Sequence, residues 1–231
     1  MHQRPRKGPL SFLPPAGRCT LHRCAAGRRK ANHRRRTLSA LHSSSSIITE
    51  RLLLARHQPE DFDDCVAMWR DPAVVRLIRS TPFDASETWS RILRCVGHWE
   101  FTGFGYWTIR TRAEHRFCGE IGFAYTHRDM PPEYAGLPEF GCTLARSAWA
   151  RNIAQEATHA ALDWMDQREG LQRTIAITDE RNRAAMALGY SVGYVRREAI
   201  PFEGHAFALM ERDGRTLSRR LEGHVAELAT R

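Results

Sequence analysis

Residues 147–157, with the sequence SAWARNIAQEA, have the pattern of an anion site at the start of a helix. A helix start exposes backbone N–H groups that have no intrahelical partner, at the positive end of the helix dipole. A pyrophosphate can bind to such groups, and Arg151 adds a cation beside the turn. Any helix start next to a loop shares these features, so an ordinary helix start remains the alternative.

The elements that must position this turn alternate between strands and helices. Strands are predicted at 48–58, 104–112, 116–128, 138–145, 172–179, 193–199 and 205–211, and helices at 59–71, 85–100, 151–168 and 182–192. Pro72 is expected to end the first helix. One stripe of the second helix is predicted to be buried: Trp89, Ile92, Val96 and Trp99. This order predicts a mixed α/β fold with one central sheet.

The charge of the chain is concentrated at one end. The net charge of +9 arises in residues 1–46, which hold eleven Lys and Arg and no Asp or Glu. The remaining 24 basic and 26 acidic side chains give residues 47–231 a net charge of −2. Nucleic acid is therefore not expected as a partner of this part, although a basic arm at 1–46 could contact it. The sequence has no run of about 18 apolar residues, so no membrane partner is expected.

The domain boundaries follow from the same composition. Residues 1–46 are predicted to be a disordered basic extension, a targeting arm, or the product of a start codon placed too far upstream. Residues 47–215 form the predicted domain and 216–231 a C-terminal tail. The six cysteines are irregularly spaced, which favours buried free thiols and a cytoplasmic location. Cys19 and Cys24 with nearby histidines fit no standard zinc pattern, so no metal is expected.

Five segments in register resemble the GNAT superfamily of N-acetyltransferases, and particularly its ribosomal-protein alanine acetyltransferases. PEFGCTL at 138–144 and ARNIAQEA at 150–157 resemble the family's strand and cofactor turn, without two of its usual glycines. Asn182, followed by Gly193 and Tyr194, has the family's spacing, but Ala185 replaces the usual serine. Residues 48–62 resemble the family's opening strand and the acidic helix that follows it, and residues 103–123 and 204–212 resemble further strands. The resemblance implies a mostly antiparallel twisted sheet, flanked by helices and splayed at a cofactor site.

The family resemblance also implies acetyl-CoA as the acyl donor. The strand would bind the pantetheine arm, the helix start its pyrophosphate, and Asn182 a pantetheine amide, although Asn182 is equally suited to be a helix N-cap. The residues implied in cofactor binding are Cys142, Leu144, Arg151, Asn152, Ile153, Ala154, Gln155 and Asn182. Asn152 tolerates a left-handed backbone, and Ala150 is acceptable if its φ is negative. We therefore expect weakened acetyl-CoA binding that glycine at both positions would tighten.

An amine must lose a proton to attack a thioester near neutral pH, which calls for a base. Glu139 is the candidate base, and Glu120 on the neighbouring strand is the second choice. Family members use the missing serine or a nearby tyrosine as proton donor to the leaving thiolate. Here Tyr194 and Tyr190 are the candidates, with Tyr194 preferred.

Three functional hypotheses remain open. The first is an N-acetyltransferase acting on a small-molecule or peptide amine, the second a GNAT-fold module that binds acyl-CoA with weakened or lost catalysis, and the third a nucleic-acid-associated protein using its basic extension. The sequence does not name the acceptor, and a homodimer is left open. Five aromatic residues could form an acceptor pocket or belong to the core: Trp99, Phe104, Tyr106, Trp107 and Phe123.

Overall fold

The computed structural model describes residues 45–168, 170–202 and 205–215, which all belong to one compact unit. The predicted C-terminal tail and nearly all of the basic extension lie outside these residues. Before the cofactor turn, the elements are β1 Ile47–Ile48, β2 Leu52–Arg56, η1 Pro59–Asp61, α2 Phe62–Arg70, α3 Pro72–Val75, α4 Ala85–Thr102, β3 Tyr106–Thr111, β4 Phe117–Ala124 and β5 Glu139–Leu144. They are followed by η2 Arg146–Ala148, α5 Ile153–Asp166, β6 Arg173–Asp179, α6 Arg183–Ser191, β7 Val195–Phe202 and β8 His205–Asp213.

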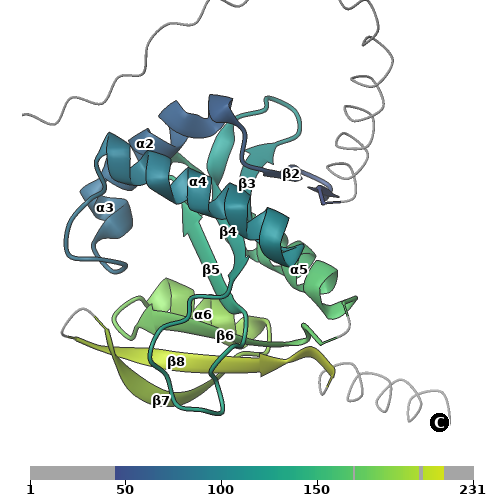
Figure 1. Cartoon of the computed structure of the whole chain (residues 1–231). Helices are drawn as coiled ribbons and strands as arrows, with labels where there is room; N and C mark the ends of the chain where they lie inside the picture. Colours follow the sequence, from purple (N-terminus) through teal and green to yellow (C-terminus); the bar gives the residue numbers. More distant parts are fainter. Residues whose placement is uncertain (1–44, 169, 203–204, 216–231) are drawn as a thin grey trace, which may run out of the picture. The chain divides into compact units, whose positions relative to one another are not determined.

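The strands form one sheet of eight in the order β1-β2-β3-β4-β5-β6-β8-β7. Every neighbouring pair is antiparallel except β5 and β6, which run parallel. Figure 1 shows β5 running steeply across the view, with β6 and β8 nearly horizontal below it. The predicted fold, a mixed α/β protein with a mostly antiparallel sheet flanked by helices, is confirmed.

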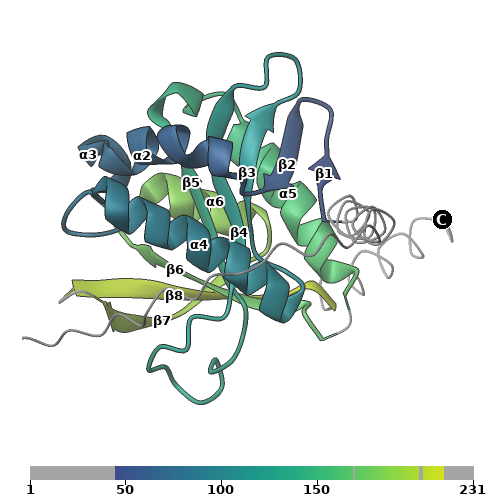
Figure 2. The same ribbon diagram turned by 45° about the horizontal axis from the view of Figure 1, so that its top comes forward.

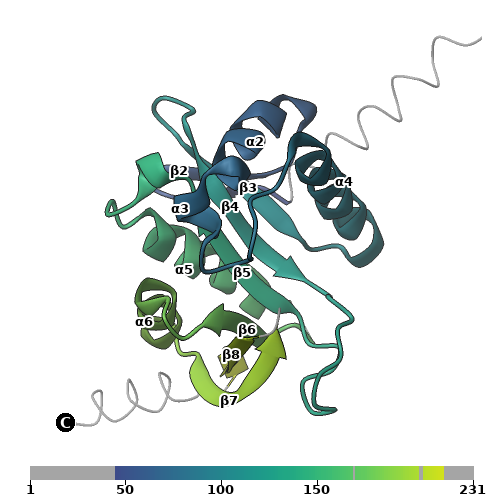
Figure 3. The ribbon, with the colours of Figure 1, turned by 90° about the vertical axis from the view of Figure 1, so that its left-hand side faces the viewer.

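The helices cover both faces of the sheet. Figure 3 shows α2 and α4 on one side of strands β3 to β5, and α5 and α6 on the other. Figures 1 and 2 both show α4 lying across these strands. A capping box fixes the start of α4, since Asp84 accepts from the Glu87 backbone N–H and Glu87 accepts from that of Asp84. Its end is Gly103, whose φ of 76° suits glycine.

Two details of the helices differ from the sequence predictions. The buried stripe of α4 consists of Thr88, Ile92, Cys95 and Trp99. Trp89 lies one position away from this stripe, at the rim of the core. Its ring packs edge-on against Phe62 there and stays 42% exposed. Pro72 follows the end of α2 but also begins α3, where a missing N–H costs nothing at the first helical position.

The thiols of the described residues match the sequence prediction. Cys65, Cys95 and Cys118 are buried and free, and Cys142 is free and partly buried. Among the described residues, no helix is both long and apolar enough to cross a membrane.

Candidate functional site

The opening in the sheet lies between β5 and β6. In the part of the chain that the structure describes, these strands pair only at Glu139 with Ile175 and at Phe140 with Ala176. Residues 141–144 of β5 continue to pair with β4 but have no β6 partner. The backbone edge of this segment, about 13 Å long at roughly 3.3 Å per residue, is therefore free to pair with an extended ligand.

A pocket of about 370 Å³ lies at the end of this free edge. It is lined by Leu144, Ala148, the 150–155 turn and, from α6, Ala187, Leu188 and Ser191. The first backbone hydrogen bond of α5 runs from Glu156 N to Asn152 O. The N–H groups of residues 153–155 thus precede the intrahelical ladder and are available to an anion. Five of the predicted cofactor residues line this pocket together with Leu144: Arg151, Asn152, Ile153, Ala154 and Gln155.

The turn before α5 contains two left-handed residues. Asn152 has φ 59° and ψ 17°, the conformation expected for it, and Ala150 has φ 57°. Alanine at position 150 was expected to be acceptable only with a negative φ, and the structure shows a positive φ instead. A left-handed alanine is strained by about 1–2 kcal/mol because its Cβ crowds the following carbonyl oxygen. The turn keeps the geometry of a glycine turn without the glycine.

A distant ion pair braces the turn from outside. Glu156, in the first turn of α5, accepts hydrogen bonds from Arg51 Nε at 2.6 Å and Thr49 Oγ1 at 2.5 Å. Arg51 also donates through Nη1 to the backbone oxygen of Arg151 at 3.2 Å. These contacts lower the pKa of Glu156, although burial opposes them. Sequence reasoning missed this brace because its partners lie about a hundred positions apart.

Glu139 stands where the free edge of β5 begins. Its carboxylate accepts from Arg128 Nη2 at 3.1 Å and from Thr126 Oγ1 at 3.1 Å. Burial raises the pKa of Glu139, and the two partners only partly offset this effect. A carboxylate with a raised pKa is a better proton acceptor than an ordinary one. Sequence reasoning did not identify Arg128 as the ion-pair partner of Glu139.

Glu120 has the opposite environment. Its side chain is fully buried and receives hydrogen bonds from His57 Nε2 at 2.9 Å, Trp69 Nε1 at 3.1 Å and Arg91 Nε at 3.0 Å. Burial raises its pKa, but Arg91 and His57 outweigh burial and hold the pKa well below the usual range. Because all of these donors already use its oxygens, Glu120 is poorly placed to take a proton from an amine.

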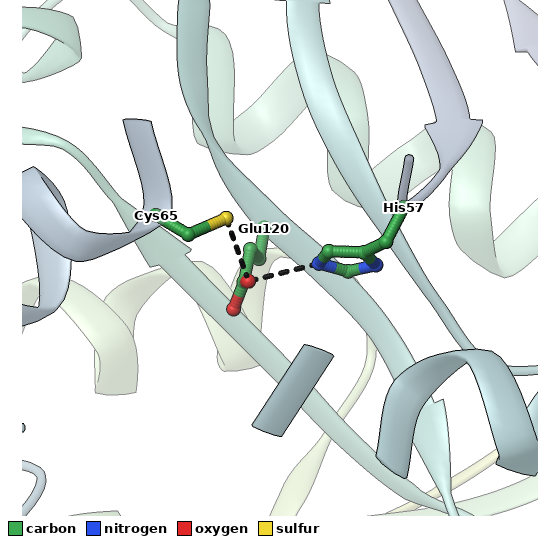
Figure 4. Close-up of side chains that lie close together, drawn as sticks. All are labelled: His57, Cys65 and Glu120. Atoms are coloured by element: carbon green, nitrogen blue, oxygen red, sulfur yellow. Dashed lines mark hydrogen bonds and ion pairs between the residues drawn. The ribbon is translucent and has the colours of Figure 1, made fainter. Parts of the chain in front are cut away.

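Figure 4 shows the side chains of His57, Cys65 and Glu120 close together. The atoms that each could offer to a metal ion lie within 4.8 Å of one another. The dashed lines in Figure 4 are hydrogen bonds to one oxygen of Glu120, from His57 at 2.9 Å and from the Cys65 thiol at 3.5 Å. Burial raises the pKa of Cys65 and keeps the thiol protonated, and Arg91 already neutralises the carboxylate. A metal ion needs deprotonated ligands, and this thiol keeps its proton. The cluster therefore serves as a hydrogen-bonded anchor between β4 and α2 and is poorly suited to bind a metal ion.

The other predicted site residues lie outside the lining of the pocket. Asn182 caps α6 by accepting from Ala185 N at 3.2 Å, which leaves its amide NH₂ group available. Cys142 is on the free segment of β5, where burial raises its pKa to about 12. Tyr194 is 2% exposed, and its hydroxyl forms a 2.8 Å hydrogen bond with Thr174. This position places Tyr194 in the core, stacked on Phe140.

The five aromatic candidates separate into two groups. Trp99, Phe104, Trp107 and Phe123 are buried in the main core, which supports the packing interpretation for them. Tyr106 is partly exposed and lies on the face covered by α4, where Arg91 stacks on its ring at 5.1 Å. Sequence reasoning could not separate Tyr106 from its neighbours, because only the strand register shows which face each aromatic residue occupies.

Comparison with known proteins agrees with this geometry. The acetyltransferase (GNAT) domain family matches residues 51–195, more than half of the chain. The uncharacterized N-acetyltransferase p20 of Bacillus licheniformis is 25% identical over 150 residues, covering 64% of this chain and 82% of p20. A solved GnaT-family acetyltransferase from Bordetella pertussis, described as putative, is 27% identical with a TM-score of 0.65, covering 72% of this chain and 98% of the other.

Two more distant solved structures share the fold. Ribosomal-protein-S5-alanine acetyltransferase from Vibrio fischeri is 16% identical with a TM-score of 0.56, covering 73% of this chain and 96% of the other. Spermidine N-acetyltransferase from Vibrio cholerae, solved with CoA and spermine, is 14% identical with a TM-score of 0.56, covering 71% of this chain and 94% of the other. The splayed sheet of this chain, with a helix N-terminus at its opening, thus belongs to a fold that it shares with solved acetyltransferases. The chain belongs to the GNAT family of acetyltransferases.

Proposed function

We propose that this protein is an acetyl-CoA-dependent N-acetyltransferase, which transfers the acetyl group to a primary amine by direct attack on the thioester. The observation that carries the proposal is the free edge of β5, which leads into the pocket at the start of α5. The pantetheine arm pairs with residues 141–144 like an added strand, and the amides of residues 153–155 bind the pyrophosphate. The acceptor is a small-molecule amine or a protein N-terminus.

Glu139 acts as the base in this proposal, directly or through a water. It lies beside the point where β5 and β6 separate, and its raised pKa suits proton transfer from an amine. Asn182 uses its carbonyl oxygen as a helix cap, so its NH₂ group can donate to the pantetheine. No metal takes part in this scheme.

A binding module with lost catalysis is the second candidate. Two observations favour it: position 185 carries alanine, and the hydroxyl of Tyr194 is committed to Thr174 in the core. Neither residue therefore offers the proton donor that the family resemblance implies, and the second tyrosine candidate, Tyr190, lies exposed on α6 outside the lining of the pocket.

Calorimetry of acetyl-CoA with the full chain, followed by thiol release with a panel of amines, separates the two. An absence of binding at millimolar acetyl-CoA contradicts both proposals, while binding without release by any amine favours the module. Ala154→Glu provides a sharp variant, because an anion at a helix N-terminus stabilises the helix but repels phosphate. We expect this variant to fold and to lose acetyl-CoA affinity, and Ala154→Gln, its neutral control, to retain it.

A further inference from the structure

Tyr106 reaches across the sheet to the strand that forms the opening. In the strand register, Tyr106 pairs with Gly122 on β4, and Gly122 pairs with Gly141 on β5. These three residues therefore form one row on the same face. Because the two glycines have no side chains, the row leaves room for the tyrosine ring. A Cβ atom built on Gly141 would lie 2.1 Å from the Tyr106 hydroxyl, so this hydroxyl lies against the backbone of β5.

The contact falls at the reactive end of the proposed cofactor site. Gly141 is the first residue of β5 without a β6 partner, and Leu144, three residues on, lines the pocket. An acetyl-CoA with its pyrophosphate in the pocket and its arm along this edge directs its thioester toward Gly141. The inference below thus rests on the proposed function.

The Tyr106 hydroxyl is free to make a new hydrogen bond. Among residues 45–168, 170–202 and 205–215, it has no hydrogen-bond partner, and the side chain is partly exposed. The charged and titratable groups that face it are Arg91 and Cys95 from α4, Glu120 from β4 and Glu139 from β5. Desolvation raises the pKa of Tyr106, an effect that Arg91 only partly offsets, so the hydroxyl keeps its proton at neutral pH and acts as a donor.

The ring that carries this hydroxyl is held in place. Arg91 stacks on the Tyr106 ring at 5.1 Å and on the Trp69 ring at 4.5 Å. Its guanidinium also forms the 3.0 Å ion pair with buried Glu120. Since Glu120 is anchored in turn by His57, the network orients Tyr106 before any ligand arrives, which is the requirement for preorganised stabilisation of developing charge.

We propose that the Tyr106 hydroxyl donates a hydrogen bond to the thioester sulfur and to the CoA thiolate that forms from it. The N–C bond of the amide forms as the C–S bond breaks, and the electron pair of the C–S bond stays on sulfur. The proton lost by the amine passes to Glu139. The tyrosine shares its proton with the thiolate without losing it, and the thiolate takes up a proton from water after release. Tyr106 thereby acts as the hydrogen-bond donor to the leaving thiolate, a role for which Ala185 has no hydroxyl and Tyr194 is buried.

The test compares CoA with S-ethyl-CoA, a thioether that has no ionisable thiol. Calorimetric dissociation constants are measured for the full chain between about pH 7 and pH 10, a range over which the thiol of CoA begins to ionise. In the wild type, the preference for CoA over S-ethyl-CoA is expected to rise with pH as the thiolate forms. Tyr106→Phe should lower the preference at high pH by about tenfold or more, the effect of one charge-assisted hydrogen bond.

Tyr134→Phe is the matched control, because Tyr134 is buried in a different cluster and the change removes the same atom. An equal rise of the preference in the wild type and in Tyr106→Phe overturns the inference and leaves the proposed function intact. A wild type that binds neither ligand refutes both. Tyr106→Phe removes no hydrogen bond between described residues, and its thermal unfolding midpoint is expected to match that of the control.

The kinetic readout adds an independent check with any accepted amine. Tyr106→Phe is expected to lower kcat about tenfold or more and to leave KM for acetyl-CoA nearly unchanged, because the hydrogen bond strengthens as charge develops on sulfur. A variant in which KM rises while kcat is unchanged contradicts the role at sulfur and indicates ground-state binding instead.

Discussion

Replacement of Ala150 by glycine is expected to stabilise the protein. Alanine at a φ of 57° carries about 1–2 kcal/mol of strain, which glycine does not. Glycine gains about 0.4–1 kcal/mol of conformational freedom in the unfolded chain, which partly offsets the benefit. The net increase in the free energy of unfolding is therefore about 0.8 kcal/mol at the midpoint of these ranges, which together span about 0–1.6 kcal/mol. For a domain of this size it corresponds to a rise in Tm of roughly 1–4 °C.

Two neighbouring replacements make the measurement specific. Asn152→Gly relieves less strain, because asparagine tolerates its φ of 59°, so its effect should stay within about 0.5 kcal/mol. Ala145→Gly acts at a φ of −59°, where alanine is unstrained, and should destabilise the protein by about 0.5–1 kcal/mol. The assay is urea unfolding of the three variants and the wild type. If Ala150→Gly is as destabilising as Ala145→Gly, the left-handed conformation of Ala150 is wrong.

The same geometry changes the expectation for cofactor binding. The turn already has its left-handed residues in the unliganded protein. Strain that is equal in the free and bound states cannot alter affinity, because a ligand responds only to differences between states. Glycine at both positions should therefore raise stability but shift the acetyl-CoA dissociation constant by no more than about threefold. A larger gain in affinity would show that the alanine methyl crowds the phosphate.

Three further outcomes follow from the site. Glu139→Gln should lower kcat/KM by about 10²–10⁴-fold, and the acid limb of the wild-type pH profile should lie above the ordinary Glu pKa of about 4.3. Glu120 has a depressed pKa, so its contribution to the free energy of unfolding is present above the unfolded-state pKa of about 4.3 and declines as the pH falls below it. Glu120→Gln should remove this decline. The variant should also lower the free energy of unfolding in urea by about 3–5 kcal/mol, because Arg91 loses its buried partner. Gly141→Ala should displace the Tyr106 hydroxyl and lower kcat, whereas Gly97→Ala, where a Cβ meets no atom within 4 Å, should not.

Local sequence patterns predicted most of the fold, and together with the family resemblance they pointed to the junction of β5 and α5 as the candidate site. The β5–α5 junction was identified because a helix start, a following apolar stripe and a preceding strand are encoded within about 30 residues. The helix-cap alternative for Asn182 is likewise confirmed by a contact three residues away. Trp89 shows the limit of this reasoning, because helical periodicity cannot distinguish the buried stripe from a stripe one position away that packs on the rim.

The long-range half of the site could not be predicted in this way. The bond between His57 and Glu120 joins residues 63 positions apart, and that between Arg51 and Glu156 spans 105. No periodic pattern encodes such pairs, since they arise only when the strand order brings distant segments together. The same applies to Tyr106, whose contact with Gly141 depends on the register of three strands.

Glu120 and Glu139 lie on neighbouring strands and on the same face of the sheet, but their carboxylates have different roles. In the register of β4 and β5, Glu120 pairs with Thr143 and Glu139 pairs with Ala124, so both acids face α4. Burial raises the pKa of both carboxyl groups, but the guanidinium of Arg91 outweighs burial at Glu120 and lowers its pKa, whereas at Glu139 burial prevails. Environments that push two pKa values apart in this way separate a fixed charge from a group that exchanges protons. Glu120 thus holds Arg91 and the ring stacked on it, and Glu139 remains the carboxylate suited to receive the proton of the amine.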